Sequence, residues 1–492
     1  MSAFETNINS ELLARKGKTY HGRTELTIAN RDLELNKDSV KTILETVLPT
    51  HFKNQKEIKE LKAYYKGVQD VLVKYKPVRA DINHKVVENN AFQIIEFKKG
   101  FVFGEPIQYV QRADVTEEEL ELLNEFFYEN GKQTKDTDLA EDLYNVGVAY
   151  RIILPSNELD APFIVENLDP RYTFVVYSND IRHKPVVAGF IYQIDDEKYE
   201  IITYTRNKVF YYQFDADSSM RISAQQVELT YTQEKHHAIG SIPIIEYKLN
   251  KSRMGLLELI KSQSDALNFI TSSDLDDIEQ FVQSLLVFLN QEVNRETLLE
   301  LLDLGALQIR SSDPKLPADV KLLTNKMSHS ETKVLYDRIY NSMLTIAGIP
   351  KTSDSKGAGG DTGQARALGD GWTMAEQRAK QDELAFKDSE MKMLKIALDI
   401  CLRKPSVEIN ELKARDIEIK FTRNRSDNML VKTQSLMNLK QAEVHPDVAY
   451  SVVGLFSDPH EAVAMSKQFF GEDFWKEKSI SNVSREEKTE EV

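Results

Sequence analysis

Apolar residues recur along the amino-terminal part of the chain at spacings that predict helices. From Asp38 to Lys66 they fall every three or four residues, and Pro49 interrupts the pattern, which predicts two helices. Residues 85–98 have the spacing of a further helix, and the short apolar runs FVF and IQYV that follow it are typical of strands. Residues 117–129 predict an amphipathic helix.

Between Gly147 and Lys248 the pattern changes to short runs of β-branched and aromatic residues separated by Asp, Asn, Ser and Pro. This alternation predicts a mostly antiparallel β unit. Its tyrosines have two interpretations, because they can form the half-buried faces of a sheet or stack against nucleobases. Alternation along the strands favours the sheet faces.

The middle of the chain has the longest helical pattern. Over residues 253–285 apolar positions alternate in steps of three and four, with polar interruptions at Gln263 and Asp274. A helix of about 33 residues would be about 50 Å long. Residues 286–325 form a small mixed unit, and residues 330–347 predict a second helix that returns along the first.

The last part of the chain is mostly helical in pattern. One very long stretch covers residues 365–402, and Gly369 and Gly371 near its start favour a bend, because glycine weakens a helix. One strand beginning at Ile417 and three short helices follow. The charged tail after Trp475 has almost no large apolar residues and is expected to be disordered.

The two long helices carry the main structural inference. An antiparallel pair with a unit of roughly 40 residues at its far end cannot bury its apolar seam inside a compact monomer without a large sheath of other elements. Further copies of the same chain would provide that sheath. The sequence therefore predicts an extended subunit that associates laterally, most simply in a closed ring.

Composition narrows the classes of function. The chain has 492 residues and a formal net charge of -15, which disfavours tight binding of nucleic acid through its phosphates. Its single cysteine, Cys401, excludes an intrachain disulfide and any multi-cysteine metal site, as expected in a reducing compartment. The amino terminus does not read as a secretory signal, and no apolar run is long enough for a transmembrane helix.

Candidate catalytic and ligand motifs fail their tests. The glycine-rich run from Gly357 to Gly363 is followed by Gln364, whereas a phosphate-binding loop needs Lys and then Ser or Thr, so a loop between helices is favoured. The acidic residues within 274–279 point to different faces of a helix, which favours a solvated face over a cation site. The histidines have no metal-binding spacing, and Cys401 sits among apolar residues as a small core side chain would. We therefore expect no enzyme activity, no cofactor and no metal.

Short motifs follow one another in a characteristic order. They are YYKGVQDVL (64–72), Asn83, VVENNAF (86–92), KKGFVFGEPI (98–107), VGVAYRIIL (146–154), Asp169-Pro170, FVVY (174–177), SDLDDIEQF (273–281), GIP (348–350) and the glycine loop before the long helix. Together they resemble the portal, or head-to-tail connector, proteins of long-tailed bacteriophages. The resemblance covers most of residues 40–400, and the last 90 residues match only in helical character.

The resemblance implies an α+β, multi-domain, portal-type subunit with a mixed α/β wing, long antiparallel stem helices, a small α/β clip, a long kinked tunnel helix and a helical crown. The implied boundaries are a wing with an N-terminal arm at 1–252, stem helix 1 at 253–285, the clip at 286–325, stem helix 2 at 326–350, the tunnel loop and tunnel helix at 351–404, the crown at 405–474 and a disordered tail at 475–492.

The resemblance also implies the function. Portal proteins form a ring, usually a dodecamer, at one capsid vertex, through which a terminase motor packages double-stranded DNA and from which the DNA is later ejected. The tunnel loop would line the channel with Lys351, Lys356, Gly357, Gly359, Gly360, Asp361, Gly363 and Arg366, and the tunnel helix would kink at Gly369 and Gly371. The clip would bind its partners through Arg295, Arg310 and Lys315.

The implied partners are other copies of the chain, the terminase large subunit, head-completion or adaptor proteins, the major capsid and scaffolding proteins, and the DNA in the channel, but no membrane. The implied location is the virion, after assembly in the host cytoplasm. Two alternatives stay open from the sequence alone. One is a capsid-associated nuclease or maturation protease, and the other is a purely structural minor capsid or adaptor protein.

Overall fold

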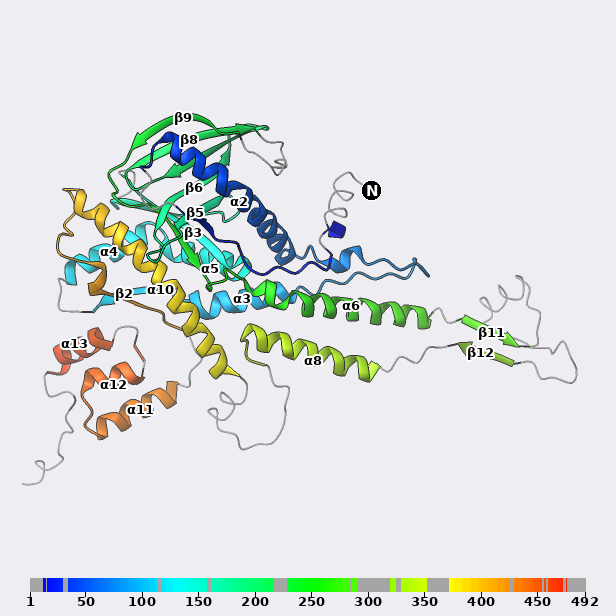
Figure 1. Ribbon diagram of the computed structural model, residues 1–492. Coiled ribbons are helices and arrows are strands. Elements are labelled where there is room, and N and C mark those ends of the chain that lie inside the picture. Colours follow the sequence, from blue (N-terminus) through cyan, green and yellow to red (C-terminus); the bar gives the residue numbers. More distant parts are fainter. Residues whose placement is uncertain are drawn as a thin grey trace, which may run out of the picture.

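The structure is a computed structural model that describes residues 12–14, 16–29, 34–112, 117–156, 161–215, 228–282, 285–289, 319–323, 329–351, 371–423, 429–453, 455–456, 459–471 and 475. These residues form helices and several separate sheets, so the predicted α+β class is confirmed. A large mixed body carries a projecting pair of helices on one side and three short helices on another (Figure 1).

A six-stranded sheet forms the upper part of the body in Figure 1. Its strands, in spatial order, are β1 (Leu26–Ile28), β5 (Thr173–Ser178), β6 (Pro185–Gln193), β7 (Lys198–Tyr204), β8 (Lys208–Asp215) and β9 (Thr230–His236). All neighbours are antiparallel except β1 and β5. The helix α2 (Lys37–Tyr65) packs its first half against the sheet, and Val40, Leu44 and Val47 belong to the same buried cluster as the strand residues Val176 and Phe210.

The second and larger core surrounds a three-stranded sheet. In this sheet β3 (Val148–Pro155) lies between β10 (Ile244–Lys248) and β4 (Phe163–Leu168). The helices around it are α3 (Asn90–Phe103), α4 (Glu117–Glu129), α5 (Lys132–Val146) and the long α10 (Trp372–Arg403). Cys401 is buried in this core, as the sequence predicts, and burial raises the pKa of its thiol to about 12.

A two-stranded ladder ties a distant part of the chain to the body. The strand β13 (Ile417–Lys420) pairs antiparallel with β2 (Gln108–Gln111), and the 3-10 helix Ala414–Asp416 packs against α10. Residues 405–423 therefore belong to the body, whereas the sequence analysis placed them in the crown. The pairing joins segments about 300 residues apart, which local patterns do not reveal.

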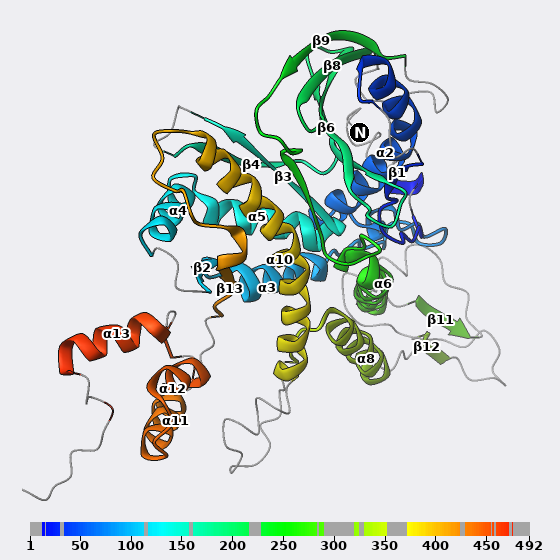
Figure 2. The same ribbon diagram turned by 60° about the vertical axis from the view of Figure 1, so that its left-hand side comes forward.

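The helices α6 (Leu256–Val282) and α8 (His329–Ala347) form the projecting pair. Both views show them side by side, with the antiparallel strands β11 (Leu285–Leu289) and β12 (Asp319–Leu323) beyond their far ends (Figures 1 and 2). Their ranges agree with the two long helices predicted over 253–285 and 330–347. Of the small unit predicted at 286–325, the structure describes these two strands.

The helices α11 (Met429–Gln441), α12 (Pro446–Val453) and α13 (Pro459–Phe470) form a separate small unit. They pack on one another, and Figure 2 shows them apart from the body. Their positions agree with the three short helices predicted from the sequence. The tail predicted to be disordered, residues 475–492, lies outside the described residues except for Trp475.

Several local predictions need correction. The segment 38–66 is one helix and not two, because Pro49 is exposed on α2 while the residues on both sides of it are buried and hold the helix together. The run FVF is the end of α3 and not a strand, since Val102 and Phe103 pack into the helical core. The helix α5 and the strands β1, β4 and β9 were not predicted from the sequence.

Candidate functional site

The helix pair α6–α8 buries one side of each helix within the subunit. Leu256, Ile260 and Leu267 of α6 and Met343 and Leu344 of α8 are all buried in the larger core. The first half of the predicted seam on α6 is therefore a contact within the chain. Such packing of two antiparallel helices fixes the direction in which the pair projects.

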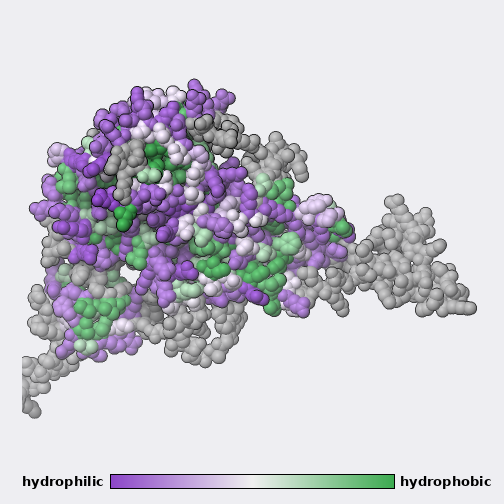
Figure 3. All heavy atoms as spheres, in the orientation of Figure 1, coloured by the Kyte–Doolittle hydropathy of each residue, from purple (hydrophilic) through white to green (hydrophobic). Residues whose placement is uncertain are grey.

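The helix pair also exposes large apolar side chains. Phe269 is 57% exposed and Val334 is 69% exposed. The further members of this set are Leu259, Leu275, Ile278 and Leu335. Figure 3 shows apolar residues gathered over α8 and near the far end of α6. Exposed apolar side chains that gather in this way are typical of a surface for association.

Buried polar contacts fix α6 to the body. Lys261 Nζ lies 2.8 Å from Asp70 Oδ2 and 2.7 Å from Asp265 Oδ2, and the Tyr64 hydroxyl donates to Asp265 Oδ1 at 2.9 Å. Asn268 donates to the buried Gln69. Because these contacts reach α2 and the chain just after it, the near half of α6 is held as part of the body.

The acidic segment of α6 holds a loop of the body rather than facing only solvent. Asp276 is buried, accepts from Lys74 Nζ at 2.8 Å and from the His84 amide at 2.6 Å, and Glu279 lies 2.7 Å from His84 Nε2. The expectation of a solvated acidic face is therefore wrong for Asp276. Within the described ranges, no three His, Cys, Asp or Glu side chains gather as metal ligands.

The two ends of the segment 352–370 lie side by side. The chain leaves the end of α8 through Pro350 and the exposed Lys351, and it returns at Gly371, the N-cap of α10. A Cβ placed on Gly371 would lie 3.6 Å from Pro350 Cα and 4.0 Å from Lys351 N. The predicted tunnel loop therefore starts from a narrow base, where Gly371 has a left-handed φ of +84° that favours glycine.

Most of the predicted site residues lie outside the described residues. These are Lys356, Gly357, Gly359, Gly360, Asp361, Gly363, Arg366 and Gly369 of the loop, and Arg295, Arg310 and Lys315 of the unit between the long helices. The structure places Lys351 and Gly371 together at the base just described. Since α10 begins after Gly371, this glycine lies at a junction before the helix and not at a bend inside it.

Aromatic and charged side chains surround the first turns of α10. The Trp372 ring lies 6.3 Å from Phe97 and 6.0 Å from Phe101 between ring centroids. Nearly three helical turns further on, Asp382 lies 3.6 Å from the buried Lys98 Nζ and accepts from the Tyr144 hydroxyl at 3.2 Å. Burial lowers the pKa of Lys98, although Asp382 opposes that shift. These contacts bind the start of α10 to α3 and α5.

A buried cluster of charges holds the middle of α10. The Glu390 carboxylate lies 2.7 Å from Lys132 Nζ and 3.6 Å from Arg151 Nη1, and it accepts from the Tyr247 hydroxyl at 2.6 Å. Asp136 lies 2.7 Å from both cations. Burial by itself raises the pKa of Glu390, but Lys132 and Arg151 outweigh it and hold this pKa below its usual value. The cluster joins α10 to α5 and β3.

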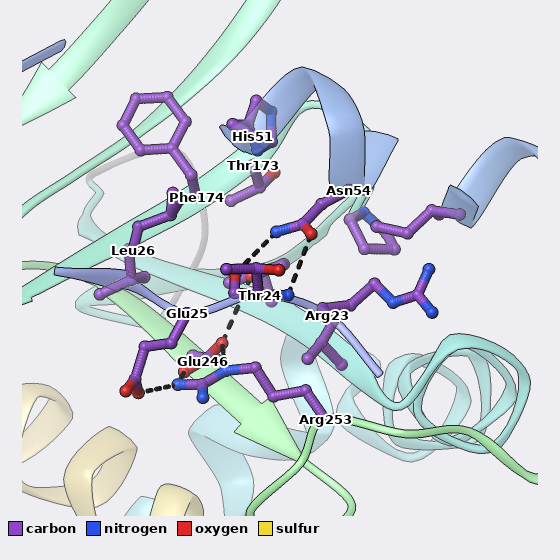
Figure 4. Close-up of a pocket in the computed structure, with 15 residues that line it drawn as sticks. Arg23, Thr24, Glu25, Leu26, His51, Asn54, Thr173, Phe174, Glu246 and Arg253 are labelled. Carbon is purple, nitrogen blue, oxygen red and sulfur yellow. Dashed lines mark hydrogen bonds and ion pairs between the residues drawn. The ribbon is translucent and has the colours of Figure 1, made fainter. Parts of the chain in front are cut away.

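Figure 4 shows a small cavity between the amino-terminal strand β1, the helix α2 and the two main sheets. Its volume of about 20 Å³ has room for one water molecule. Arg253 pairs with Glu25 and with Glu246 below the cavity, and Asn54 exchanges two hydrogen bonds with the backbone of Thr24. This cavity is too small for a substrate. The contacts around it join the amino-terminal segment to the body.

The sequence does not reveal these clusters. Lys132 and Arg151 lie on the consecutive elements α5 and β3, but Glu390 is more than 200 residues further along the chain, so no local pattern joins the three. The tyrosines of the sheets were assigned to half-buried faces, and Tyr199, Tyr204 and Tyr212 are buried, which supports that assignment. Among the described residues, no helix combines the length and apolar character needed to cross a lipid bilayer.

The fold and the exposed helix pair are those of an elongated α+β protein with apolar side chains available for association. The chain matches the sequence model of the family described as phage portal protein, SPP1 Gp6-like, over residues 44–466. Because this match covers most of the 492 residues, the chain belongs to that family. Membership gives the chain the portal, or connector, role of a structural component of phage particles.

Other comparisons are weaker. No curated protein sequence matches the chain. A chain in a structure titled "Neck of empty GTA particle computed with C6 symmetry" is 12% identical, with a TM-score of 0.43 over 74% of this chain and 90% of that one. A chain in "Virion of native gene transfer agent (GTA) particle" is 11% identical, with a TM-score of 0.44 over 92% of this chain and 99% of that one.

Proposed function

We propose that identical copies of this chain form a closed ring, a dodecamer by family resemblance, at one vertex of a phage capsid. The observation that carries this proposal is the set of exposed apolar side chains on the α6–α8 pair. Phe269, Val334 and Leu335 are exposed in the single subunit, and neighbouring copies of the chain would cover them. Within the ring, α6 and α8 are the stem.

Double-stranded DNA passes through this ring when the terminase motor packages it and again when it is ejected. The loop from Lys351 to Gly363 borders the channel. It belongs to the segment 352–370, whose flanking residues Lys351 and Gly371 lie together at the base of α10. The acidic chain does not hold the DNA tightly, because exposed charges are screened over about 8 Å at physiological salt. Lys351, Lys356 and Arg366 make weak, salt-dependent contacts with passing phosphates.

The remaining parts serve docking. The clip, residues 286–325, binds the terminase large subunit and then the head-completion proteins through Arg295, Arg310 and Lys315. The body forms the wing that meets the major capsid and scaffolding proteins, and α11–α13 form the crown. The ring itself has no catalytic turnover, and a separate motor hydrolyses ATP. Assembly takes place in the host cytoplasm, and the finished ring belongs to the virion.

Sedimentation velocity with negative-stain electron microscopy of the full-length protein tests the ring. We expect particles far heavier than the 56.4 kDa chain, with a central opening. Phe269→Glu places a charge on the outward side of α6 and reduces the fraction of rings at least tenfold. Ile181→Glu is the matched control, because Ile181 is 96% exposed in a turn of the six-stranded sheet. Only monomers and dimers at every salt and protein concentration would contradict the ring.

Crosslinking during packaging tests the loop separately. Single cysteines at Lys356 or Asp361, in a Cys401→Ala background that keeps a small apolar side chain in the core, should crosslink to DNA stalled in the ring. A cysteine at the exposed Ile181 should not. If loop cysteines in intact rings react only with reagents outside the ring and never with DNA, the loop does not border the channel.

A further inference from the structure

The loop of residues 74–85, called the basic loop here, runs along α6 toward its far end (Figure 1). Both of its ends are fixed to the acidic segment of α6. Lys74 Nζ lies 2.8 Å from Asp276 Oδ2, and the His84 amide donates to Asp276 Oδ1 at 2.6 Å. The loop is therefore held in place at the far half of the helix pair.

Between these anchors the basic loop exposes two large apolar side chains. Tyr75 is 80% exposed and Val78 is 71% exposed. Lys74 and His84, which precede and follow them in the loop, contact Asp276, so the backbone between these anchors is fixed beside α6. Two apolar side chains fixed at the tip of an anchored loop are unfavourable in water and favour a contact with another protein surface.

The charges of the basic loop differ from those of the rest of the chain. It contains Lys74, Lys76, Arg79 and Lys85 against one acid, Asp81, in a chain with a net charge of -15. The far half of the helix pair is acidic, with Asp274, Asp276, Asp277 and Glu279 on α6 and Glu331 on the first turn of α8. Lys74 and Lys76 pair with Asp276 of the same chain, and Arg79 pairs with Asp81. The exposed Lys85 is the charge of the basic loop that suits acids of a second copy, such as the exposed Glu331.

The position of the basic loop suits such a contact, on the basis of the proposed ring. Rotation about the ring axis carries each copy to its neighbour without a change of height along the axis. The basic loop lies beside the far half of its own helix pair, through Asp276 and Glu279, so it also lies at the height of the neighbour's helix pair. The exposed Val334 and Leu335 of α8 lie in that far half.

We propose that the basic loop docks on the helix pair of a second copy of this chain. Tyr75 and Val78 pack against Val334 and Leu335 of the neighbour, and Lys85 lies near the acidic end of the neighbour's α6. Nucleic acid is the less suitable partner, because Val78 gains nothing from phosphates and the net charge of the chain is -15. The basic loop then forms part of the interface between neighbouring stems.

Mixed assembly of two single-cysteine chains tests this proposal directly. One tagged chain carries Tyr75→Cys and the other carries Leu335→Cys, both with Cys401→Ala, and a short bifunctional maleimide is added to the mixed rings. Only a contact between copies links the two tags in one covalent dimer. We expect that dimer for this pair, and none when Ile181→Cys replaces Tyr75→Cys. Intact rings without the dimer would overturn the proposal while leaving the ring itself unaffected.

A second measurement uses the double variant Tyr75→Ser, Val78→Ser. We expect the protein concentration at which half of the rings dissociate to rise at least tenfold, with Ile181→Ser unchanged. Rings of unchanged stability would overturn the proposal. If such rings also retained DNA less well, the basic loop would contact DNA instead of a second copy. Absence of rings from the unmodified protein would contradict the proposed function instead.

Discussion

His51 gives the stability of this protein a specific dependence on pH. It lies on α2 with 3% of its surface exposed, its ring centroid is 5.9 Å from that of Phe52 and 5.2 Å from that of Phe174, and its Nε2 atom has no hydrogen-bond partner. Burial lowers the pKa of His51 to about 4. In the unfolded chain a histidine has a pKa of about 6.5.

The difference between the two pKa values sets the direction and the size of the effect. Between about pH 6.5 and pH 4 the unfolded chain binds a proton at His51 that the folded chain does not, so the folded state loses stability as the pH falls. At pH 5 the loss from His51 alone is about 2 kcal/mol per chain relative to pH 7.5. Below about pH 4 both states bind the proton, so the loss from this group has reached its full size and grows no further.

Urea unfolding of the full-length protein at pH 7.5 and pH 5, at one protein concentration, measures this effect. In the unmodified protein, the free energy of unfolding falls between pH 7.5 and pH 5, and His51 contributes about 2 kcal/mol of that fall. His51→Gln removes the titrating group, so this contribution should disappear. Phe210→Leu, in the same buried cluster as Phe174, lowers stability at both pH values but keeps His51 and its two ring neighbours, and it should keep the full pH difference. An unchanged pH difference in His51→Gln would refute the reasoning.

Three further substitutions test single features of the fold by the same urea titrations. Glu390→Leu leaves buried cations without their carboxylate and should cost about 3 kcal/mol, whereas Asp388→Asn on the exposed side of α10 should cost less than about 1 kcal/mol. Gly348→Ala should destabilise the protein more than Gly131→Ala. Both glycines have a positive φ, but only at Gly348 would a new Cβ lie 2.9 Å from another side chain. Asn36→Ala removes the cap of α2 and should cost about 1 kcal/mol, and an unchanged midpoint would contradict that role.

The sequence by itself determined the elements whose pattern is local. The long helices over 253–285 and 330–347, most strands between Gly147 and Lys248 and the three carboxyl-terminal helices agree with the structure, because apolar spacing within one element indicates which face it buries. Ordered motifs along the chain also identified the family. The sequence predicted that copies of the chain cover the apolar seam of the long helices, whereas the structure buries the first half of the seam on α6, with Leu256, Ile260 and Leu267, inside the subunit.

Only the tertiary structure decided which distant segments meet. Glu390, Lys132 and Arg151 form one buried cluster although each is unremarkable in its local sequence, and β13 finds β2 across about 300 residues. The helix α2 continues through Pro49 because burial on both sides outweighs one missing hydrogen bond. The basic loop lies on α6 because Asp276 and Glu279 contact its anchors Lys74 and His84. Local patterns report which face of an element is apolar, whereas pairing between elements depends on contacts that form only when the whole chain has folded.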